Sequence, residues 1–136
     1  MIRFYEYKAG DKHYLLIDGR QLNVERFKKR DMAHALCLQY GTDAMAVVEE
    51  SETADFGICS FDSDGTASTA SAPLLACTVA FADVLGIKPF HTKEYTVSDS
   101  ASVHSANIDS HLGEIKMVTI DGSTQIEALN LGDLVE

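Results

Sequence analysis

The chain has 136 residues, of which 46% are apolar and 24% charged, a composition that fits one folded domain and excludes a mainly disordered chain. Eleven lysines and arginines against twenty-one aspartates and glutamates leave a net charge of −10, which disfavours binding to nucleic acid or to an anionic membrane. The longest apolar run, Ala72–Phe81, is too short to span a membrane. The N-terminus has no signal-peptide apolar region, and the three cysteines form no CxxC pair, so a cytoplasmic protein is expected.

The charge is unevenly distributed along the chain. Residues 1–30 carry eight basic and four acidic groups, whereas residues 31–87 carry nine acidic groups and neither lysine nor arginine. Residues 88–136 carry three basic and eight acidic groups. An acidic stretch of this kind is often only a solvated face, but it also favours contact with a basic surface.

The first half of the chain predicts two strands, a helix and a strand pair. The strands are expected at Ile2–Tyr7, His13–Asp18, Ala44–Glu49 and Phe56–Phe61, and the helix at Val24–Leu38 with Asn23 as its N-cap. Tyr14–Ile17 is continuously apolar, which is typical of a strand covered on both faces.

The second half predicts a buried helix followed by strands. Asp62–Gly65 is a strong turn signal, and Pro73 begins a helix over Leu74–Leu85 that Gly86 ends. That helix is apolar almost all round and has to be enclosed. Further strands are expected at Glu94–Val97, Val103–Ile108, Glu114–Ile120 and Gln125–Leu131. The order predicts one α+β domain over residues 1–136, with a curled, mainly antiparallel sheet wrapped around a buried central helix.

Several segments resemble the diaminopimelate epimerases. Tyr14–Gly19 resembles the family's apolar strand ending in Asp-Gly, Tyr40–Asp43 its Gly-x-Asp turn, and Phe61–Thr66 its Phe-Asn-x-Asp-Gly-Ser segment. Ser71–Cys77 then overlays the catalytic Cys-Gly-Asn-Gly-x-x-Cys start of the central helix. The resemblance implies one half of a diaminopimelate-epimerase-like fold, whose two halves hold the substrate between them and supply one cysteine base each.

The departures from that family fall on its active site. Lys12, Asp62, Ser71, Ala72 and Pro73 occupy the positions that differ. A serine hydroxyl is a much weaker acid than a thiol, and proline lacks the N–H that would help hold a substrate carboxylate. The expectation is therefore a degenerate former active site with no catalytic residues, in a protein that is not an enzyme. Cys77 aligns with the family's second, non-catalytic cysteine and is expected in the core.

Metal and cofactor motifs are weak. The five histidines show neither HxxxH nor HExxH spacing, and Asp62–Thr66 does not complete a calcium loop. Neither a Walker A nor a GxGxxG pattern occurs. We therefore expect no metal site and no cofactor.

The acidic residues suggest a binding function. We expect one acidic end of a hairpin to be the partner-binding surface, made by Glu49, Glu50, Glu52, Asp55, Asp62 and Asp64. The combination of this fold with an acidic surface resembles the phage-encoded type I-C anti-CRISPR proteins. That resemblance implies an inhibitor encoded by a phage or mobile element that acts in the bacterial cytoplasm as a monomer or weak homodimer. Its partner would be the basic DNA-binding surface of the Cascade surveillance complex, on the Cas8-type large subunit, which it would block by DNA mimicry.

Two alternatives remain open. The first is an amino-acid racemase or epimerase in which two chains pair, so that Ser71 from each faces a shared cleft. The second is an interaction protein with another basic partner, or a structural dimer. The loss of the thiol, of the substrate-binding amide and of the carboxylate-binding N–H groups argues against the first alternative.

Overall fold

The computed structural model describes residues 4–20, 26–89, 92–111, 114–126 and 134–135. Its helices are α1 (Arg26–Tyr40) and α2 (Ala72–Leu85). Its strands are β1 (Phe4–Ala9), β2 (Lys12–Asp18), β3 (Ala44–Glu49), β4 (Phe56–Asp62), β5 (Ala67–Ser68), β6 (Glu94–Ser98), β7 (Val103–His111), β8 (Glu114–Ile120), β9 (Ser123–Ile126) and β10 (Leu134–Val135).

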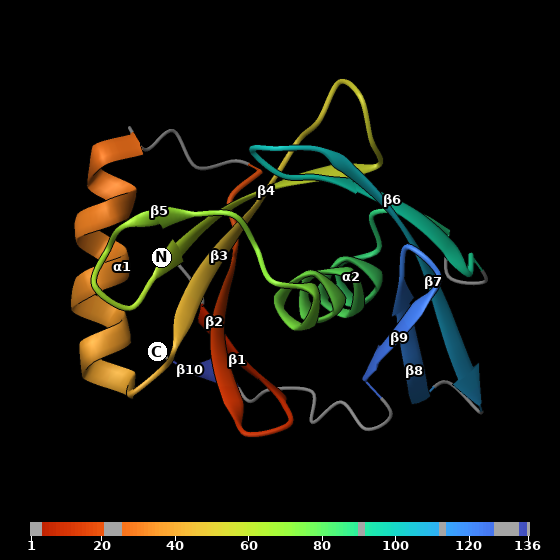
Figure 1. The fold of residues 1–136 in the computed structure, drawn as a ribbon, viewed down its shortest axis with the longest axis horizontal. Helices are drawn as coiled ribbons and strands as arrows, with labels where there is room; N and C mark the ends of the chain where they lie inside the picture. The colour runs from red at the N-terminus through yellow and green to blue at the C-terminus, as the bar shows by residue number, and fades with distance from the viewer. Residues whose placement is uncertain (1–3, 21–25, 90–91, 112–113, 127–133, 136) are drawn as a thin grey trace.

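These strands form one sheet that curls around α2. The order is β10-β1-β2-β3-β4-β6-β7-β8-β9, with β5 paired to β4 beside this path. α2 lies in the hollow of the sheet, and α1 covers its outer face over the first strands (Figure 1). The α+β architecture predicted from the sequence, a curled sheet around a buried helix, is confirmed.

The sheet is mixed because each helix connects a parallel pair. β2 and β3 pair in parallel and α1 lies between them in the chain, while β4 and β6 pair in parallel and α2 lies between them. Parallel neighbours need such a crossover, whereas the remaining pairs are antiparallel. Each helix therefore lies over a face of the sheet rather than extending the chain away from it.

The strand β2 is buried on both faces, as its continuous apolar run predicts. Leu15 and Ile17 pack in the cluster under α1, while Leu16 packs in the cluster around α2. Successive side chains of a strand point to opposite faces, so a strand between two helical layers has to be apolar at every position. Burial of a large apolar side chain stabilises a fold by roughly 1.5–3 kcal/mol, and β2 contributes on both sides.

The central helix begins and ends with caps encoded locally. Ser71 is the N-cap, with extended backbone and a side chain that accepts from the Leu74 N–H. Gly86 ends the helix in the left-handed conformation, where its N–H donates to carbonyls of the last turn. Every residue from 74 to 82 is buried, which confirms that this helix is enclosed.

The predicted boundaries are close to those of the structure. α1 ends at Tyr40, two residues later than expected, and the predicted cap Asn23 lies outside the described residues. α2 begins at Ala72, so Pro73 occupies its second position rather than its first. The last predicted strand corresponds in part to β9, and its end at Leu131 lies outside the described residues. Within the described ranges, neither helix is long and apolar enough to cross a membrane.

Candidate functional site at the start of the central helix

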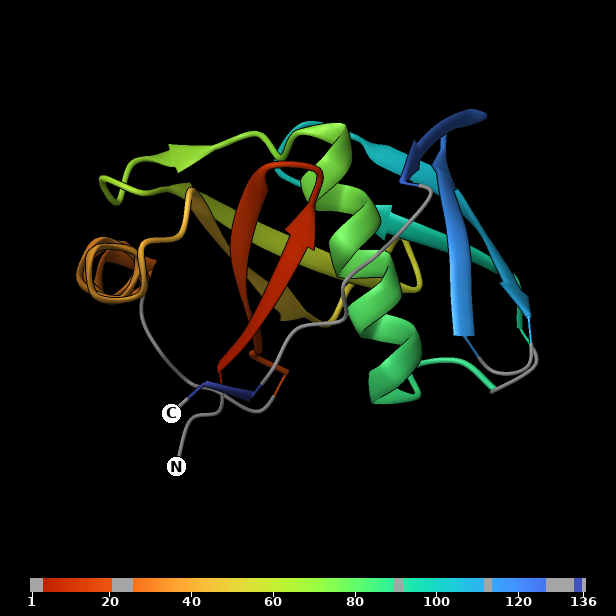
Figure 2. The same ribbon diagram turned by 90° about the horizontal axis from the view of Figure 1, so that it is seen from below.

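The first turn of α2 lies beside one edge of the sheet. At this edge β2 and β3 begin and β4 ends, so that Tyr14, Ala44 and Asp62 align in register across the three strands. Figure 2 shows this turn next to the β1–β2 hairpin. Two hydrogen bonds between the same residues stabilise this edge: the Asp43 N–H donates to the His13 carbonyl (2.7 Å), and the His13 N–H donates to the side-chain Oδ2 of Asp43 (2.8 Å).

Ser71 is exposed and hydrogen-bonded to a buried phenol. Its Oγ accepts from the Leu74 N–H at 3.3 Å and also contacts the hydroxyl of Tyr14, which is 5% exposed. Burial raises the pKa of Tyr14, although the hydrogen bond with Ser71 opposes this shift. The phenol is therefore protonated at neutral pH and does not serve Ser71 as a base.

Backbone donors at this helix start are already largely used. Leu74 donates to the Ser71 side chain, Leu75 donates to the Ser71 carbonyl (2.9 Å), and Pro73 has no N–H. The N–H of Ala72, also in the first turn, takes part in none of these bonds. A ligand carboxylate would meet that N–H and the positive end of the helix dipole.

The structure brings the predicted former-active-site residues to the same edge. Ser71, Ala72 and Pro73 form the start of α2, while exposed Lys12 begins β2 and exposed Asp62 ends β4. β2 and β4 are separated by β3, which places their backbones about 10 Å apart. Sequence reasoning did not include Tyr14 as a site residue, because its contact with Ser71 is long-range. Asp43 lies in the Tyr40–Asp43 segment that resembled a family turn, and that was the available signal.

Cys77 lies one and a half turns further into α2 and belongs to the core. It is fully buried, and burial raises the pKa of its thiol to about 12. Such a thiol stays protonated at neutral pH and cannot serve as a general base. The prediction that Cys77 is a core residue is confirmed.

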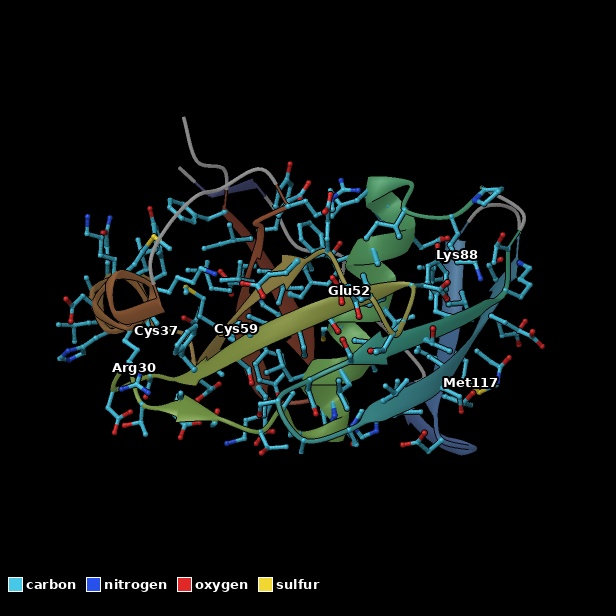
Figure 3. The ribbon with its side chains drawn as sticks, turned by 90° about the horizontal axis from the view of Figure 1, so that it is seen from above. Arg30, Cys37, Glu52, Cys59, Lys88 and Met117 are labelled. Carbon is cyan, nitrogen blue, oxygen red and sulfur yellow. The ribbon has the colours of Figure 1, made fainter. Side chains whose placement is uncertain are left out.

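The acidic residues do not gather on one end, so that expectation is wrong. Glu49, Glu50, Glu52 and Asp55 lie in or beside the β3–β4 loop, whereas Asp62 and Asp64 lie in the β4–β5 turn. The two groups are at opposite ends of the seven-residue strand β4, a separation of roughly 20 Å. In Figure 3, Glu52 lies near β6, while Arg30 lies far from it on α1, close to the β4–β5 turn.

Among the described residues, two of these six carboxylates form ion pairs with lysine. Glu49 forms an ion pair with Lys29 of α1, and Asp55 pairs with Lys88 at 3.3 Å. Glu50 and Glu52 are exposed in the loop between them. Beside this loop lies a polar cavity of about 470 Å³, whose lining includes Lys29, Glu49 and Glu50 and the turn at 98–100.

Comparison with known proteins identifies the fold but no sequence family. No protein-family model and no curated protein sequence matches the chain. Among solved structures, a hydroxyproline epimerase from Agrobacterium vitis with bound trans-4-hydroxy-L-proline matches with TM-score 0.70 and 14% identity over 88% of this chain and 40% of its own. A probable proline racemase from Agrobacterium radiobacter with bound carbonate matches with TM-score 0.69 and 14% identity over 88% and 41%. A PhzF-family phenazine biosynthesis protein from Bacillus anthracis matches with TM-score 0.64 and 16% identity over 88% and 39%.

The chain therefore has the fold shared by PhzF proteins, proline racemases and diaminopimelate-epimerase-like proteins, and it spans about two fifths of the length of these structures. These structures, together with a methylitaconate delta-isomerase, include a racemase, an epimerase and an isomerase. The prediction that this protein is not an enzyme is corrected by that finding, because the fold it rested on is one that carries enzymes.

Proposed function

We propose that this chain is one lobe of an isomerase of the racemase and epimerase class, which acts on a small amino acid and completes its site by pairing with a second copy. The observation that carries the proposal is the match, over 88% of this chain, to two fifths of a hydroxyproline epimerase and of a proline racemase. The exposed start of α2, where the Ser71 side chain forms hydrogen bonds with Tyr14 and with the Leu74 N–H, is the part of the lobe that offers polar groups to a ligand.

The chemistry of such a reaction explains why two lobes are needed. Inversion at an α-carbon removes a proton from one face and delivers a proton to the other, so one acid–base group is required on each face. One lobe supplies one Ser71, and two paired copies would supply two across a shared cleft. The remaining Ala72 N–H and the positive end of the helix dipole suit the substrate carboxylate. A serine hydroxyl is a weak acid–base group, so we expect slow turnover.

The test is the interconversion of L- and D-proline, and of trans-4-hydroxy-L-proline and its α-epimer cis-4-hydroxy-D-proline, followed together with incorporation of solvent deuterium at the α-carbon. The wild type is compared with Ser71→Ala, Ser71→Cys and a control, Ser100→Ala, which changes an exposed serine on a different turn. We expect Ser71→Ala to abolish exchange and Ser71→Cys to raise it at least about tenfold, because a thiol with a pKa near 8.5 ionises far more readily than a hydroxyl.

Two results would contradict the proposal. One is the absence of exchange in both the wild type and Ser71→Cys at concentrations where sedimentation shows a dimer. The other is exchange that Ser71→Ala leaves intact, since the start of α2 would then not be the site.

A second candidate function rests on the exposed carboxylates of the β3–β4 loop. Glu50 and Glu52 lie within the stretch 31–87 that contains neither lysine nor arginine. We propose that this loop binds a basic, DNA-binding surface of a partner protein. The resemblance to anti-CRISPR proteins names Cascade and its Cas8-type subunit as that partner. The solved structures compared above are enzymes, so this candidate depends on charge alone.

A gel-shift assay of target DNA with purified Cascade tests this second candidate. We expect the wild type to reduce DNA binding, Glu50→Lys with Glu52→Lys to relieve that effect, and the matched reversal Asp62→Lys with Asp64→Lys, at the other end of β4, to retain it. Added salt should weaken the effect, because screening shortens charge attraction. Unchanged DNA binding at every protein concentration would exclude Cascade as the partner.

A further inference from the structure

His104 joins two turns that are far apart in the chain. It lies near the start of β7, and both of its ring nitrogens face carboxylates. Nδ1 is 2.7 Å from Asp121 Oδ2 in the β8–β9 turn, and Nε2 is 3.1 Å from Asp99 Oδ2 in the β6–β7 turn. A ring with an oxygen of a carboxylate at each nitrogen suits the imidazolium, because only that form has an N–H at both positions.

The two carboxylates also organise the backbone of their turns. The side chain of Asp99 is 2% exposed, and its Oδ1 accepts from the N–H groups of Ala101 and Ser102, each at 2.8 Å. Asp121 has a left-handed backbone with φ of 50° and accepts from the Ser105 N–H at 3.0 Å. A buried carboxylate needs a cation or several donors, so the charge on His104 bears directly on the geometry of both turns.

Ser102 offers an alternative partner for the same nitrogen. Its Oγ lies 3.1 Å from His104 Nε2, so that Ser102, His104 and Asp121 have the spacing of a serine–histidine–aspartate relay. The contact with Asp99 is incompatible with a catalytic relay, because an imidazolium that donates hydrogen bonds to two carboxylates cannot accept a proton from serine. Once the ring is neutral, Nδ1–H can still donate to Asp121, but the Nε2 lone pair can only accept, and Ser102 is the donor within reach.

We propose that the proton on His104 locks the β6–β7 turn, and that its loss transfers Nε2 from Asp99 to Ser102 and loosens that turn. The turn is one wall of the polar cavity of about 470 Å³, because Ser98, Asp99 and Ser100 line it. The protonation state of His104 therefore controls the shape of this cavity, whose lining also includes Thr69, two residues before the N-cap of α2.

The direction of the pH dependence follows from the groups that face His104. These are Asp121, from the β8–β9 turn, and Asp99, from the β6–β7 turn. The hydrogen bond to Asp121 raises the pKa of His104, with burial opposing and Asp99 adding to the rise. A raised pKa means that the lock is complete below the ordinary histidine value of about 6.5 and is lost as the pH rises through the higher value of the folded protein.

The experiment is an NMR titration of the wild-type protein from about pH 5.5 to 9, with amide exchange corrected for its intrinsic pH dependence. We expect His104 to titrate above about 6.5, and the protection of the Ala101 and Ser102 amides to fall with the same midpoint, about tenfold for each unit by which folding raises that pKa. His104→Gln should abolish the pH-dependent change in the protection of these amides. His34→Gln, an exposed histidine on α1, should leave that change as in the wild type.

Three results would overturn the proposal. The first is protection of Ala101 and Ser102 that does not change through the titration of His104. The second is protection that rises with pH. The third is the same pH-dependent change in His104→Gln as in the wild type. Because the titration uses the unaltered protein, a failure of the variant to fold would not prevent the test.

Discussion

At the scale of single residues, Gly65 in the β4–β5 turn is restricted both by its backbone conformation and by a close neighbour. Its φ is +88°, which is a left-handed conformation, and a Cβ built there would lie 2.7 Å from the carbonyl oxygen of Arg30. Two independent constraints therefore exclude a larger residue: the backbone conformation and the close approach of α1. The turn signal Asp62–Gly65 predicted the first constraint, whereas the second arises from tertiary packing.

We predict that Gly65→Ala lowers the free energy of unfolding by about 2–3 kcal/mol, of which about 1 kcal/mol reflects the positive φ and the rest the contact with Arg30. Urea denaturation measures the change. Gly10→Ala is the matched control, since Gly10 also has a positive φ (+64°) but a Cβ there meets nothing within 4 Å. If both variants lose the same free energy, the contact with α1 contributes nothing.

At the scale of elements, the start of α2 depends on one side chain. The Ser71 hydroxyl satisfies the Leu74 N–H, and a helix start without such a cap leaves a donor unpaired. The same hydroxyl is the group that we propose for proton transfer. Its structural and chemical roles can be separated because they respond differently to substitution.

We predict that Ser71→Ala lowers the free energy of unfolding by about 1 kcal/mol, while Ser71→Asn, which retains a capping oxygen, stays within about 0.5 kcal/mol of the wild type. Both variants should lose isomerase activity. Thermal and urea denaturation provide the comparison, with exposed Thr69→Ala as the control for a nearby change that leaves the cap intact. A loss of stability in Ser71→Asn as large as in Ser71→Ala would show that the cap is not the stabilising feature.

The elements also show how far the sequence can predict this fold. The apolar runs at Tyr14–Ile17 and along α2 were sufficient to predict a two-sided strand and an enclosed helix, because burial dictates their composition. The two-residue strands β5 and β10 were missed, since pairs this short are set by their partners rather than by propensity. The contact of Ser71 with Tyr14 was missed for the same reason: it depends on how the sheet curls.

The prediction for the acidic residues failed at this scale as well. Closeness in sequence was taken as closeness in space, but β4 runs the full distance between Asp55 and Asp62. An extended strand advances about 3.3 Å per residue, so seven residues separate its two ends widely. The acidic surface is therefore at least two surfaces, and each needs its own charge-reversal variant.

At the scale of the whole molecule, the net charge of −10 opposes compaction. We predict that raising sodium chloride from about 20 mM to about 500 mM at pH 7 increases the melting temperature by a few degrees, because screening weakens repulsion between carboxylates. Differential scanning calorimetry measures the shift. A melting temperature that falls with salt would show that the ion pairs Lys29–Glu49 and Lys88–Asp55 outweigh this repulsion.

Acid should destabilise the molecule, because the folded structure lowers the pKa values of two aspartates. Hydrogen bonds lower the pKa of Asp18, chiefly through Arg20, and of Asp121, chiefly through His104. A lowered pKa means that the associated stability is present above the ordinary carboxyl value near 4 and is lost as the pH falls through the lower values of the folded protein. We predict acid unfolding below about pH 4, followed by circular dichroism, with a lower midpoint pH in the wild type than in Asp18→Asn.

The central claim is that the start of α2 is a ligand site of an isomerase lobe, and a map of amide chemical shifts tests it most directly. L-proline and trans-4-hydroxy-L-proline are titrated into the isotopically labelled chain, with glycerol as a ligand that lacks a carboxylate. The account predicts saturable shifts at Ala72, Leu74 and Asp43 for the amino acids and none for glycerol. Shifts confined to the β3–β4 loop, or no saturable shift at any concentration, would contradict it.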